Sequence, residues 1–399
     1  MTRSSLARRL EGVSESATLK LNAMVQQMKA QGIDVVNLTA GEPDFPPLEA
    51  AKEGAIEAVR ANKSKYTPVP GVPELRELIA ARTNRQQPAL KKPWTAKEVV
   101  VSNGGKQAIF DTFLALIDPG DEVLIPSPYW LSYPEMVKLA GGIPKYIPAT
   151  FEREYKITPE QLKSAIGPKV KAIVFNSPSN PTGSMYSKSE FKALADVLLA
   201  LPEAERPWVV SDEIYDMITF MSEPFCSFLN AAPELQSRVI TVNGLSKSGA
   251  MTGWRLGWSV AQEPITGALI TLQGQSTSGI CAITQAAGIA ALKRPESEFA
   301  QLAKPFHHRR SLALEILKKA AKIKLFAPQG AFYFFLGIGG YLKGGEDSFG
   351  FAERLLEHAR VAVVPGTPFG EPECVRASFA TDEKSLEEGC RRIVEFLSK

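Results

Sequence analysis

The sequence predicts an α/β protein with a large, mostly parallel sheet followed by a smaller α+β region. Short apolar runs alternate with amphipathic stretches along most of the chain, which is typical of parallel strands joined by helices. The 399 residues correspond to two or three domains at roughly 150 residues each. The alternation ends near residue 278. We therefore expect a large domain at 46–289 and a small domain at 290–399, with the N-terminal segment 1–45 packed against the small one.

Apolar spacing and turn residues place the elements of the first half. Helices are expected at 17–31, 48–61, 73–84 and 106–117. Strands are expected at 33–38, 98–102 and 121–125. The first helix is expected to end at Gly32, and the strand at 98–102 runs into the glycine pair Gly104 and Gly105. A glycine pair between a strand and a helix favours a tight connection.

The same alternation continues in the second half. Buried strands are expected at 170–176, 208–211 and 239–242, with an amphipathic helix at 188–201 between the first two. Beyond residue 278, one long helical region is expected at 284–320, followed by the segment 330–334 (GAFYF), then 361–364 and 375–379, and a closing helix. The end of the regular alternation of strands and helices is the reason for expecting a second domain.

Composition argues against several classes of protein. The net charge is only +3, from 46 basic and 43 acidic residues, which does not favour a nucleic-acid-binding protein. Four well-separated cysteines are typical of reduced thiols in a cytoplasmic protein. No apolar stretch reaches the roughly 18 residues that would span a membrane. Residues 1–22 lack the apolar core of a secretory signal. The three histidines, His307, His308 and His358, suggest no metal site.

A lysine among small residues is the first candidate catalytic group. Lys247 lies in the segment 246–255, just after the expected strand at 239–242. Desolvation there would lower its pKa and make it a better nucleophile toward an aldehyde. Arg255, eight positions later, suits bidentate binding of a phosphate. Alone, such a lysine is more often a surface residue.

An acid at a strand end is the second candidate. Asp212 closes the apolar run at 208–211, and α/β sheets bind ligands at such strand ends. A carboxylate there would pair with a protonated pyridine nitrogen. The alternative is a helix N-cap. Taken alone, Asp212 favours the cap.

Two turns complete the pattern. Asn180 lies in a turn at 176–183 that two prolines and a glycine make rigid, and its amide would hydrogen-bond a planar phenolic oxygen. Backbone N–H groups at Gly105 and Lys106 would form an anion site where a helix starts. The segment is not a nucleotide-binding P-loop, because Gln107 follows the lysine. Each turn is weak evidence alone, but the order of all these groups within one α/β domain favours a single site.

Together these segments resemble the fold-type I pyridoxal-phosphate aminotransferases of class I/II, and specifically the Iβ group of bacterial aspartate aminotransferases. The resemblance covers nearly the whole chain. The matching stretches are 38–45 (LTAGEPDF), 65–68, 71–76, 104–108, 127–130, 176–183, 211–215, 246–257, 364–366 and 375–378. So many ordered matches make the family assignment specific.

The resemblance implies a role for each matching residue around pyridoxal 5'-phosphate. Lys247 would bind the cofactor covalently and later act as general acid and base. The ring would contact Asp212 at its nitrogen, Asn180 and Tyr215 at its phenolic oxygen, and Trp130 on its face. The phosphate would lie among Gly105, Lys106, Ser246 and Arg255, with Tyr66 from a second subunit. A homodimer with shared active sites is therefore implied.

The resemblance also implies how substrate binds. Arg376 would hold the α-carboxylate, with Gly41 and Asn180 nearby. Lys106 occupies the position that contacts a distal carboxylate, and Thr18 lies in the segment that senses substrate. Hydroxyl groups at 276–278 of the second subunit would add to this site. The expected reaction moves the amino group of L-aspartate or L-glutamate to a 2-oxo acid such as 2-oxoglutarate, by a ping-pong mechanism.

Two features leave alternatives open. Many relatives have Ser or Thr where this chain has Gly244, so one hydroxyl donor to the phosphate is missing unless Ser246 or backbone N–H groups replace it. Lysine at 106 is a single flexible charge, not a planar fork, and would tolerate more than one acid. Dual use of aspartate and prephenate therefore stays open.

Other enzyme classes on the same fold are further alternatives. They are an aromatic or neutral amino-acid aminotransferase and a pyridoxal-phosphate-dependent lyase or decarboxylase. Stoichiometry separates transfer from lysis, because a transferase stops after one half-reaction without a 2-oxo acid. A non-catalytic, cofactor-binding regulator is a third class, but such proteins usually carry an added DNA-binding domain, for which this chain leaves no room.

Overall fold

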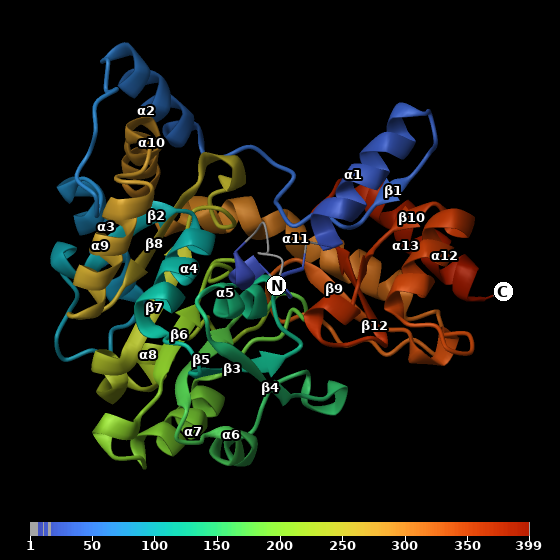
Figure 1. Cartoon of the computed structure of the whole chain (residues 1–399). Coiled ribbons are helices and arrows are strands. Elements are labelled where there is room, and N and C mark those ends of the chain that lie inside the picture. The colour runs from blue at the N-terminus through green and yellow to red at the C-terminus, as the bar shows by residue number, and fades with distance from the viewer. Residues whose placement is uncertain (1–6, 11, 15–16, 399) are drawn as a thin grey trace.

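The predicted α/β class is confirmed by the computed structural model, which describes residues 7–10, 12–14 and 17–398 (Figure 1). A seven-stranded sheet has the order β2-β8-β7-β6-β5-β3-β4. Its strands are β2 (Val99–Asn103), β3 (Glu122–Ser127), β4 (Ile143–Pro148), β5 (Val170–Asn176), β6 (Trp208–Asp212), β7 (Val239–Gly244) and β8 (Leu256–Val260). All pairings are parallel except those of β8, which runs antiparallel to both its neighbours. The sheet is therefore mixed but mostly parallel.

Both faces of this sheet are buried. Val99 and Val101 of β2 join one apolar core cluster, while Val100 between them joins another. Successive side chains of a strand point to opposite faces, so a strand covered on both sides reads as a continuous apolar run. The associated helices are α2 (Glu49–Arg60), α3 (Pro73–Gln86), α4 (Gly105–Leu116), α5 (Ser132–Leu139), α6 (Pro159–Ala165), α7 (Lys188–Leu199), α8 (Phe228–Ala231), α9 (Ile265–Ser276) and α10 (Ala282–Leu292).

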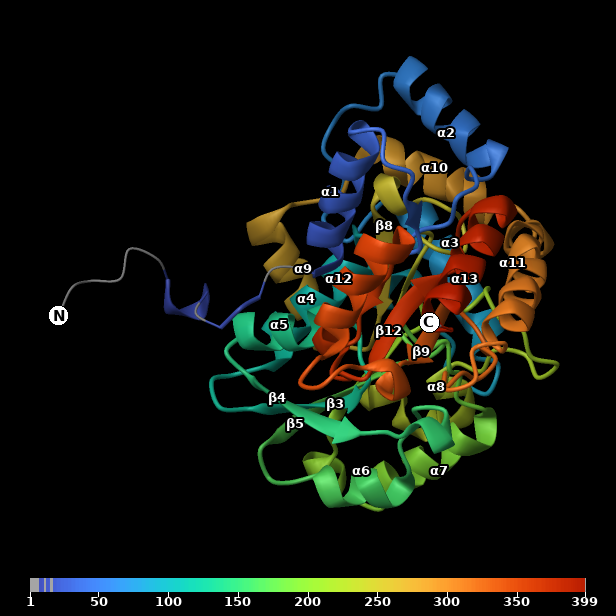
Figure 2. The same cartoon turned by 90° about the vertical axis from the view of Figure 1, so that its right-hand side faces the viewer.

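A smaller sheet lies to one side, with the N-terminal helix beside it (Figures 1 and 2). Its antiparallel order is β11-β12-β9, formed by β9 (Tyr333–Gly337), β11 (Val364–Pro365) and β12 (Cys374–Ser378). The strand β1 (Val36–Asn37) pairs in parallel with β10 (Val361–Ala362), which joins the two ends of the chain. The remaining helices are α1 (Ala17–Ala30), α11 (Glu296–Leu317), α12 (Ser348–Ala359) and α13 (Glu383–Leu397).

Several predicted boundaries were wrong. The helix expected at 284–320 is two helices, α10 and α11, because Pro295 cannot continue a helix and is the N-cap residue of α11. The strand expected at 33–38 is only two residues long, and the segment 361–364 is divided between β10 and β11. The strands β4 and β8 were not predicted. β4 contains prolines at 144 and 148, which sheets tolerate at an edge, and it is an edge strand.

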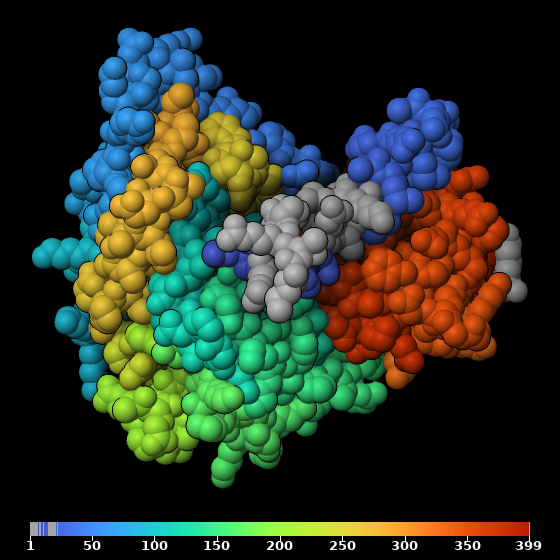
Figure 3. Space-filling view, in the orientation of Figure 1, coloured from blue at the N-terminus to red at the C-terminus, as the bar shows by residue number. Residues whose placement is uncertain are grey.

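The arrangement brings the ends of several strands to one place. β5, β6 and β7 are parallel neighbours, so their carboxyl ends lie at the same edge of the sheet. The space-filling view shows the α2 and α10 helices standing out from the body at one end (Figure 3). Among the described residues, none of the helices is apolar and long enough to cross a membrane.

Candidate active site

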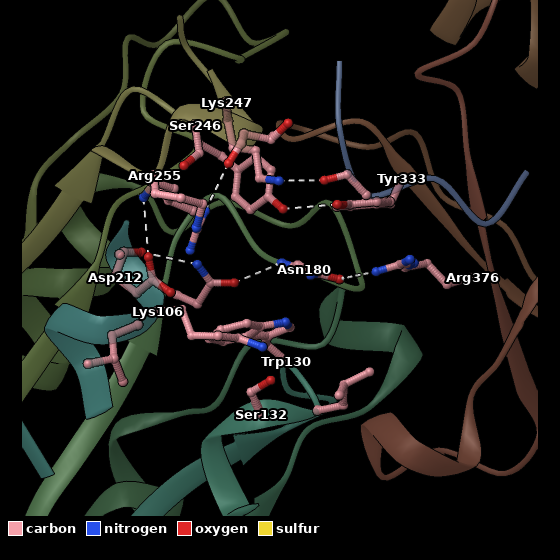
Figure 4. Close-up of a pocket in the computed structure, with 18 residues that line it drawn as sticks. Lys106, Trp130, Ser132, Asn180, Asp212, Ser246, Lys247, Arg255, Tyr333 and Arg376 are labelled. Atoms are coloured by element: carbon pink, nitrogen blue, oxygen red, sulfur yellow. Dashed lines mark hydrogen bonds between the residues drawn. The ribbon is translucent and has the colours of Figure 1, made fainter. Parts of the chain in front are cut away.

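A cavity of about 340 Å³ lies at the carboxyl ends of β5, β6 and β7 and extends toward the small sheet. Predicted site residues line it, namely Gly41, Gly105, Lys106, Trp130, Asn180, Asp212, Tyr215, Ser246, Lys247, Arg255 and Arg376. Lys247, Asp212 and Arg255 approach from the large sheet, and Arg376 and Tyr333 enter from the opposite side (Figure 4). Residues from both sheets therefore face one cavity.

Some predicted site residues lie elsewhere. Tyr66 is 97% exposed and is not part of the cavity wall. Thr18 belongs to α1, but its side chain lies outside the part of the chain that the structure describes. Thr277, next to the end of α9, accepts a hydrogen bond from Gln107 (3.0 Å) and does not line the cavity. The resemblance assigned Tyr66 and residues 276–278 to a second subunit, so their position in a single chain does not test these roles.

Lys247 lies in the turn that follows β7, close to the backbone of Gly41. Its amino group donates a hydrogen bond to the carbonyl of Gly41. Burial lowers the pKa of Lys247 to about 8, although the nearby carboxylate of Glu42 opposes this effect. A larger share of Lys247 is therefore neutral near physiological pH than for an exposed lysine, and only the neutral amine is a nucleophile.

Asp212 is a buried carboxylate at the end of β6. Its Oδ2 accepts a hydrogen bond from the Tyr133 hydroxyl (2.5 Å), and its Oδ1 accepts one from the backbone of Ile214 (3.3 Å). Burial nevertheless raises the pKa of Asp212 to about 6. A turn, not a helix, follows Asp212, so the helix-cap reading is wrong. A buried carboxylate is stabilised by a cation, and Asp212 thus suits a positively charged ring nitrogen.

Gly104 and Arg255 form a compact cradle at the start of α4. Arg255 donates to the carbonyls of Asn103 (3.0 Å) and Thr252 (2.9 Å), which lays its guanidinium against Gly104. Gly104 has a φ of +80°, which disfavours any other residue, and a Cβ there would lie 2.6 Å from the Nη2 of Arg255 and displace its guanidinium. The first N–H groups of a helix have no partner within the helix and attract anions. The cradle is therefore suited to a phosphate.

Gly244 has a structural reason for being glycine. A Cβ there would lie 2.7 Å from the carbonyl oxygen of Leu256, because β7 and β8 approach closely. This backbone leaves no room for Ser or Thr at 244. Ser246, which lines the cavity, is the nearby hydroxyl on the same turn.

Arg376 is a buried cation with spare hydrogen-bonding capacity. It is 2% exposed on β12. Its Nη1 donates to the Oδ1 of Asn180 (2.9 Å) and its Nη2 to the carbonyl of Thr39 (3.0 Å). Its Nε is buried without a partner among the described residues. A guanidinium so placed suits a carboxylate ligand.

The sequence analysis missed several residues of the cavity wall. They are Ile109, Leu131, Ser132, Asn176, Ile214, Thr252 and Tyr333. Asn176, Ile214 and Thr252 lie inside the matching stretches 176–183, 211–215 and 246–257. Their closeness in sequence to Asn180, Asp212 and Lys247 was the signal that could have indicated them. Tyr333 is different, because it comes from a small-sheet strand whose only signal was its aromatic composition.

Comparisons with known proteins agree with this geometry. The family model for aminotransferase class I and II matches residues 33–393. A probable aspartate/prephenate aminotransferase of Rhizobium leguminosarum bv. phaseoli is 42% identical over 398 residues, covering 98% of each chain. An aspartate aminotransferase of Geobacillus stearothermophilus is 41% identical, again over 98% of each chain. The structure of an aspartate aminotransferase from Thermus thermophilus with maleate superposes with a TM-score of 0.91 at 39% identity, covering 99% of this chain and 100% of that one.

Proposed function

The chain belongs to the class I and II aminotransferases and is therefore an aminotransferase, and from this premise we propose its cofactor, substrates and site residues. The proposed cofactor is pyridoxal 5'-phosphate. The proposed reaction moves the amino group of L-aspartate or L-glutamate to a 2-oxo acid such as 2-oxoglutarate. The observation that carries the proposal is the meeting of Lys247, Asp212, Arg255 and Arg376 around one cavity.

The cavity fits this cofactor by its donor set. Asp212 is a buried carboxylate that has no cationic hydrogen-bond partner within the described part of the chain, which matches a protonated pyridine nitrogen. The cradle of Gly104 and Arg255, at the start of the helix that begins with Gly105, matches a phosphate. A side chain at 104 would displace the guanidinium of Arg255 from this cradle. Asn180 and Tyr215 would hold the phenolic oxygen, and Trp130 would lie on the ring face.

The proposed mechanism uses these groups to hold and move protons. When bound, the cofactor withdraws electrons from the substrate α-carbon. Arg376 binds the α-carboxylate and thereby orients the α-carbon toward Lys247. The Lys247 amine, released from the Gly41 carbonyl, takes the proton from the α-carbon and returns it as general base and acid. Asp212 would hold a proton at the ring nitrogen, because a buried carboxylate is stabilised by a neighbouring cation.

Lys106 is the proposed contact for the distal carboxylate. Its ammonium lies 5.2 Å from the centre of the Trp130 ring, at the cavity wall. Lys106→Gln should lower kcat/KM for L-aspartate by roughly 10-fold to 100-fold, since a hydrogen bond to a charged group contributes about 1.5–3 kcal/mol. Activity with L-alanine, which has no distal carboxylate, should change little. Steady-state kinetics with both amino acids measures this.

The control for this prediction is Lys138→Gln, which removes a lysine paired with Glu135 on α5, outside the cavity wall. It should leave both activities unchanged. Equal losses for aspartate and alanine in Lys106→Gln would instead place Lys106 at the cofactor and contradict the dicarboxylate role. The dual aspartate/prephenate reading is the second candidate, favoured by the names of the relatives and by the single flexible charge at 106.

The titration of Lys247 gives a prediction on pH. Neutral amine, and hence reaction with an electrophile, increases as pH rises through the Lys247 pKa of about 8. The Glu42 carboxylate raises that pKa, so Glu42→Gln should lower the midpoint by roughly half a pH unit, a modest shift because Glu42 is exposed. Competitive acetylation of the cofactor-free enzyme, read by mass spectrometry, measures the midpoint. Glu53→Gln on α2 is the exposed control, and an upward shift in Glu42→Gln would refute the assignment.

We further propose a homodimer located in the cytoplasm. Support for the dimer is the exposure of Ile56 (49%) and Val59 (57%) on α2, a helix that stands out from the body (Figure 3), and the 97% exposure of Tyr66 nearby. Two large apolar side chains exposed on one protruding helix, with an exposed tyrosine six residues after it, suit an interface. Support for the cytoplasm is that all four cysteines are free thiols. Sedimentation of the purified protein tests the dimer.

The deciding experiment for the function is a half-reaction. The purified protein is mixed with pyridoxal phosphate, and its visible absorption is recorded before and after L-aspartate is added without a 2-oxo acid. The expected result is conversion to the spectrum of the aminated cofactor, with recovery when 2-oxoglutarate is added. Continuous turnover without a 2-oxo acid would indicate a lyase, and a band that ignores aspartate would refute the dicarboxylate donor.

A further inference from the structure

Tyr333 is a cavity residue to which none of the roles above is assigned. It begins β9, is 1% exposed, and lines the cavity on the side of Arg376 (Figure 4). Its place is fixed by pairing with Ser378 of β12, two residues beyond Arg376. Its ring and its hydroxyl contact two different functional groups.

The ring of Tyr333 supports the guanidinium of Arg376. The Cζ of Arg376 lies 4.4 Å from the centre of this ring, well within the distance of a cation–π contact. Beside this contact, Arg376 still donates to Asn180 and Thr39, and its Nε has no partner among the described residues. The charge of Arg376 therefore acts directly on Tyr333.

The hydroxyl of Tyr333 contacts the hydroxyl of Tyr215 at 2.9 Å, and either atom is able to donate. Burial raises the pKa of both phenols, and the charge of Arg376 opposes that rise in each of them. Arg376 contacts the ring of Tyr333, and a cation against a phenol ring makes its hydroxyl a better donor, so the favoured arrangement is the one in which Tyr333 donates and Tyr215 accepts. A hydroxyl has one proton. The proton of Tyr215 is thus left for the cavity.

We propose that Tyr333 is a positioning residue, which donates to Tyr215, directs the Tyr215 proton toward the phenolic oxygen of the cofactor, and links that proton to the charge on Arg376. The inference rests on the proposed pyridoxal-phosphate function. Hydrogen bonds in a chain strengthen one another, so donation by Tyr333 makes Tyr215 a stronger donor. A carboxylate bound at Arg376 offsets its charge and weakens this chain. Substrate binding on one side of the cavity is thereby coupled to a proton on the other.

Tyr333→Phe isolates the hydroxyl, because it keeps the ring under Arg376. The visible absorption band of the holoenzyme changes when the cofactor-bound nitrogen of Lys247 loses its proton. The readout is the pH at the midpoint of this change. Without Tyr333 as donor, Tyr215 donates less strongly and the ring oxygen keeps more negative charge. The Lys247 nitrogen conjugated with the ring then retains its proton to higher pH, and the midpoint should rise by roughly half to one pH unit. Tyr155→Phe, which removes a buried hydroxyl bonded to Cys374 outside this cavity, should leave the midpoint unchanged.

Two further variants test the direction of the effect. Replacement of Tyr333 by 3-fluorotyrosine makes its hydroxyl more acidic and should lower the midpoint. In a Tyr215→Phe background, Tyr333→Phe should add no further shift, because Tyr333 acts through Tyr215. An unchanged midpoint in Tyr333→Phe, or a shift that persists without the Tyr215 hydroxyl, would overturn the proposal.

Maleate, a dicarboxylate without an amino group, tests the link to Arg376. Bound maleate should raise the pH midpoint of the unmodified holoenzyme. The rise should be smaller in Tyr333→Phe, because that variant lacks the hydroxyl that links Arg376 to Tyr215. An equal rise in both proteins would refute the link. A wild-type protein that forms no visible band with pyridoxal phosphate refutes the proposed function itself. A normal band whose midpoint ignores Tyr333 refutes this inference alone.

Discussion

Lys247→Ala should lower kcat for transamination by roughly 10⁴-fold or more, the largest loss expected from any single substitution in this chain. General acid–base catalysis alone contributes roughly 10²–10⁴-fold, and this lysine is also the proposed covalent anchor of the cofactor. The structure adds a reason why no other group replaces it. Two lysines are among the described residues that line the cavity. The amine of Lys247 contacts Gly41, whereas that of Lys106 lies against Trp130, so Lys106 does not take the place of Lys247.

Steady-state kinetics and the visible spectrum measure this loss together. Lys293→Ala, which removes an exposed lysine paired with Glu74, is the control and should retain full activity. The Lys247→Ala protein should still fold, because the lost amine makes one hydrogen bond, to a backbone carbonyl, and Asp212 keeps its hydrogen bonds from Tyr133 and Ile214. Retention of activity within a factor of ten would mean that another base moves the proton, and the assignment of Lys247 would be wrong.

Arg376→Leu should lower kcat/KM for amino-acid substrates by roughly 30-fold to 5000-fold. Loss of one partner of a buried charged pair typically costs about 2–5 kcal/mol, and the substrate carboxylate is the proposed partner. Arg376→Lys should recover part of this loss only. Lysine keeps the charge, but it cannot hold Asn180, Thr39 and a carboxylate with one planar fork.

The control for Arg376→Lys is Arg354→Lys. Arg354 is also largely buried and pairs with Glu346, but it lies on α12 away from the cavity. Kinetics and thermal unfolding of both variants separate a binding loss from a folding loss. If Arg354→Lys lowers kcat/KM as much as Arg376→Lys does, the effect comes from the small sheet as a whole and not from a carboxylate contact.

Five of the seven strands of the large sheet, all but β4 and β8, were predictable to within two residues, and β5 at 170–176 matched its prediction at both ends. Its strands are buried on both faces, and continuous apolar runs between amphipathic helices are a strong local signal. The small-sheet region was less predictable, because β1, β10 and β11 have only two residues each and exist through pairing. The domain bounds at residues 45 and 289 stay a prediction.

The meeting of Asp212, Asn180 and Lys247 at one edge was also predictable, because Asp212 ends β6, the other two follow β5 and β7, and parallel neighbours end at one edge. Their catalytic roles stay a prediction. The position of Tyr333 was not predictable. Its contact with Tyr215 joins residues 118 positions apart, and nothing in either segment indicates the other. The same holds for the bond from Lys247 to Gly41, across 206 positions.

The sequence by itself thus determined the family, the mostly parallel sheet and the chemistry of the groups in the cavity, since each depends on local patterns or on ordered motifs. Only the tertiary structure decided that β8 runs antiparallel between β2 and β7, that a side chain at 244 has no room, and that Tyr333 contacts both Tyr215 and Arg376. These features depend on which distant segments pack together. That choice follows from the burial of the whole chain and not from any one stretch of it.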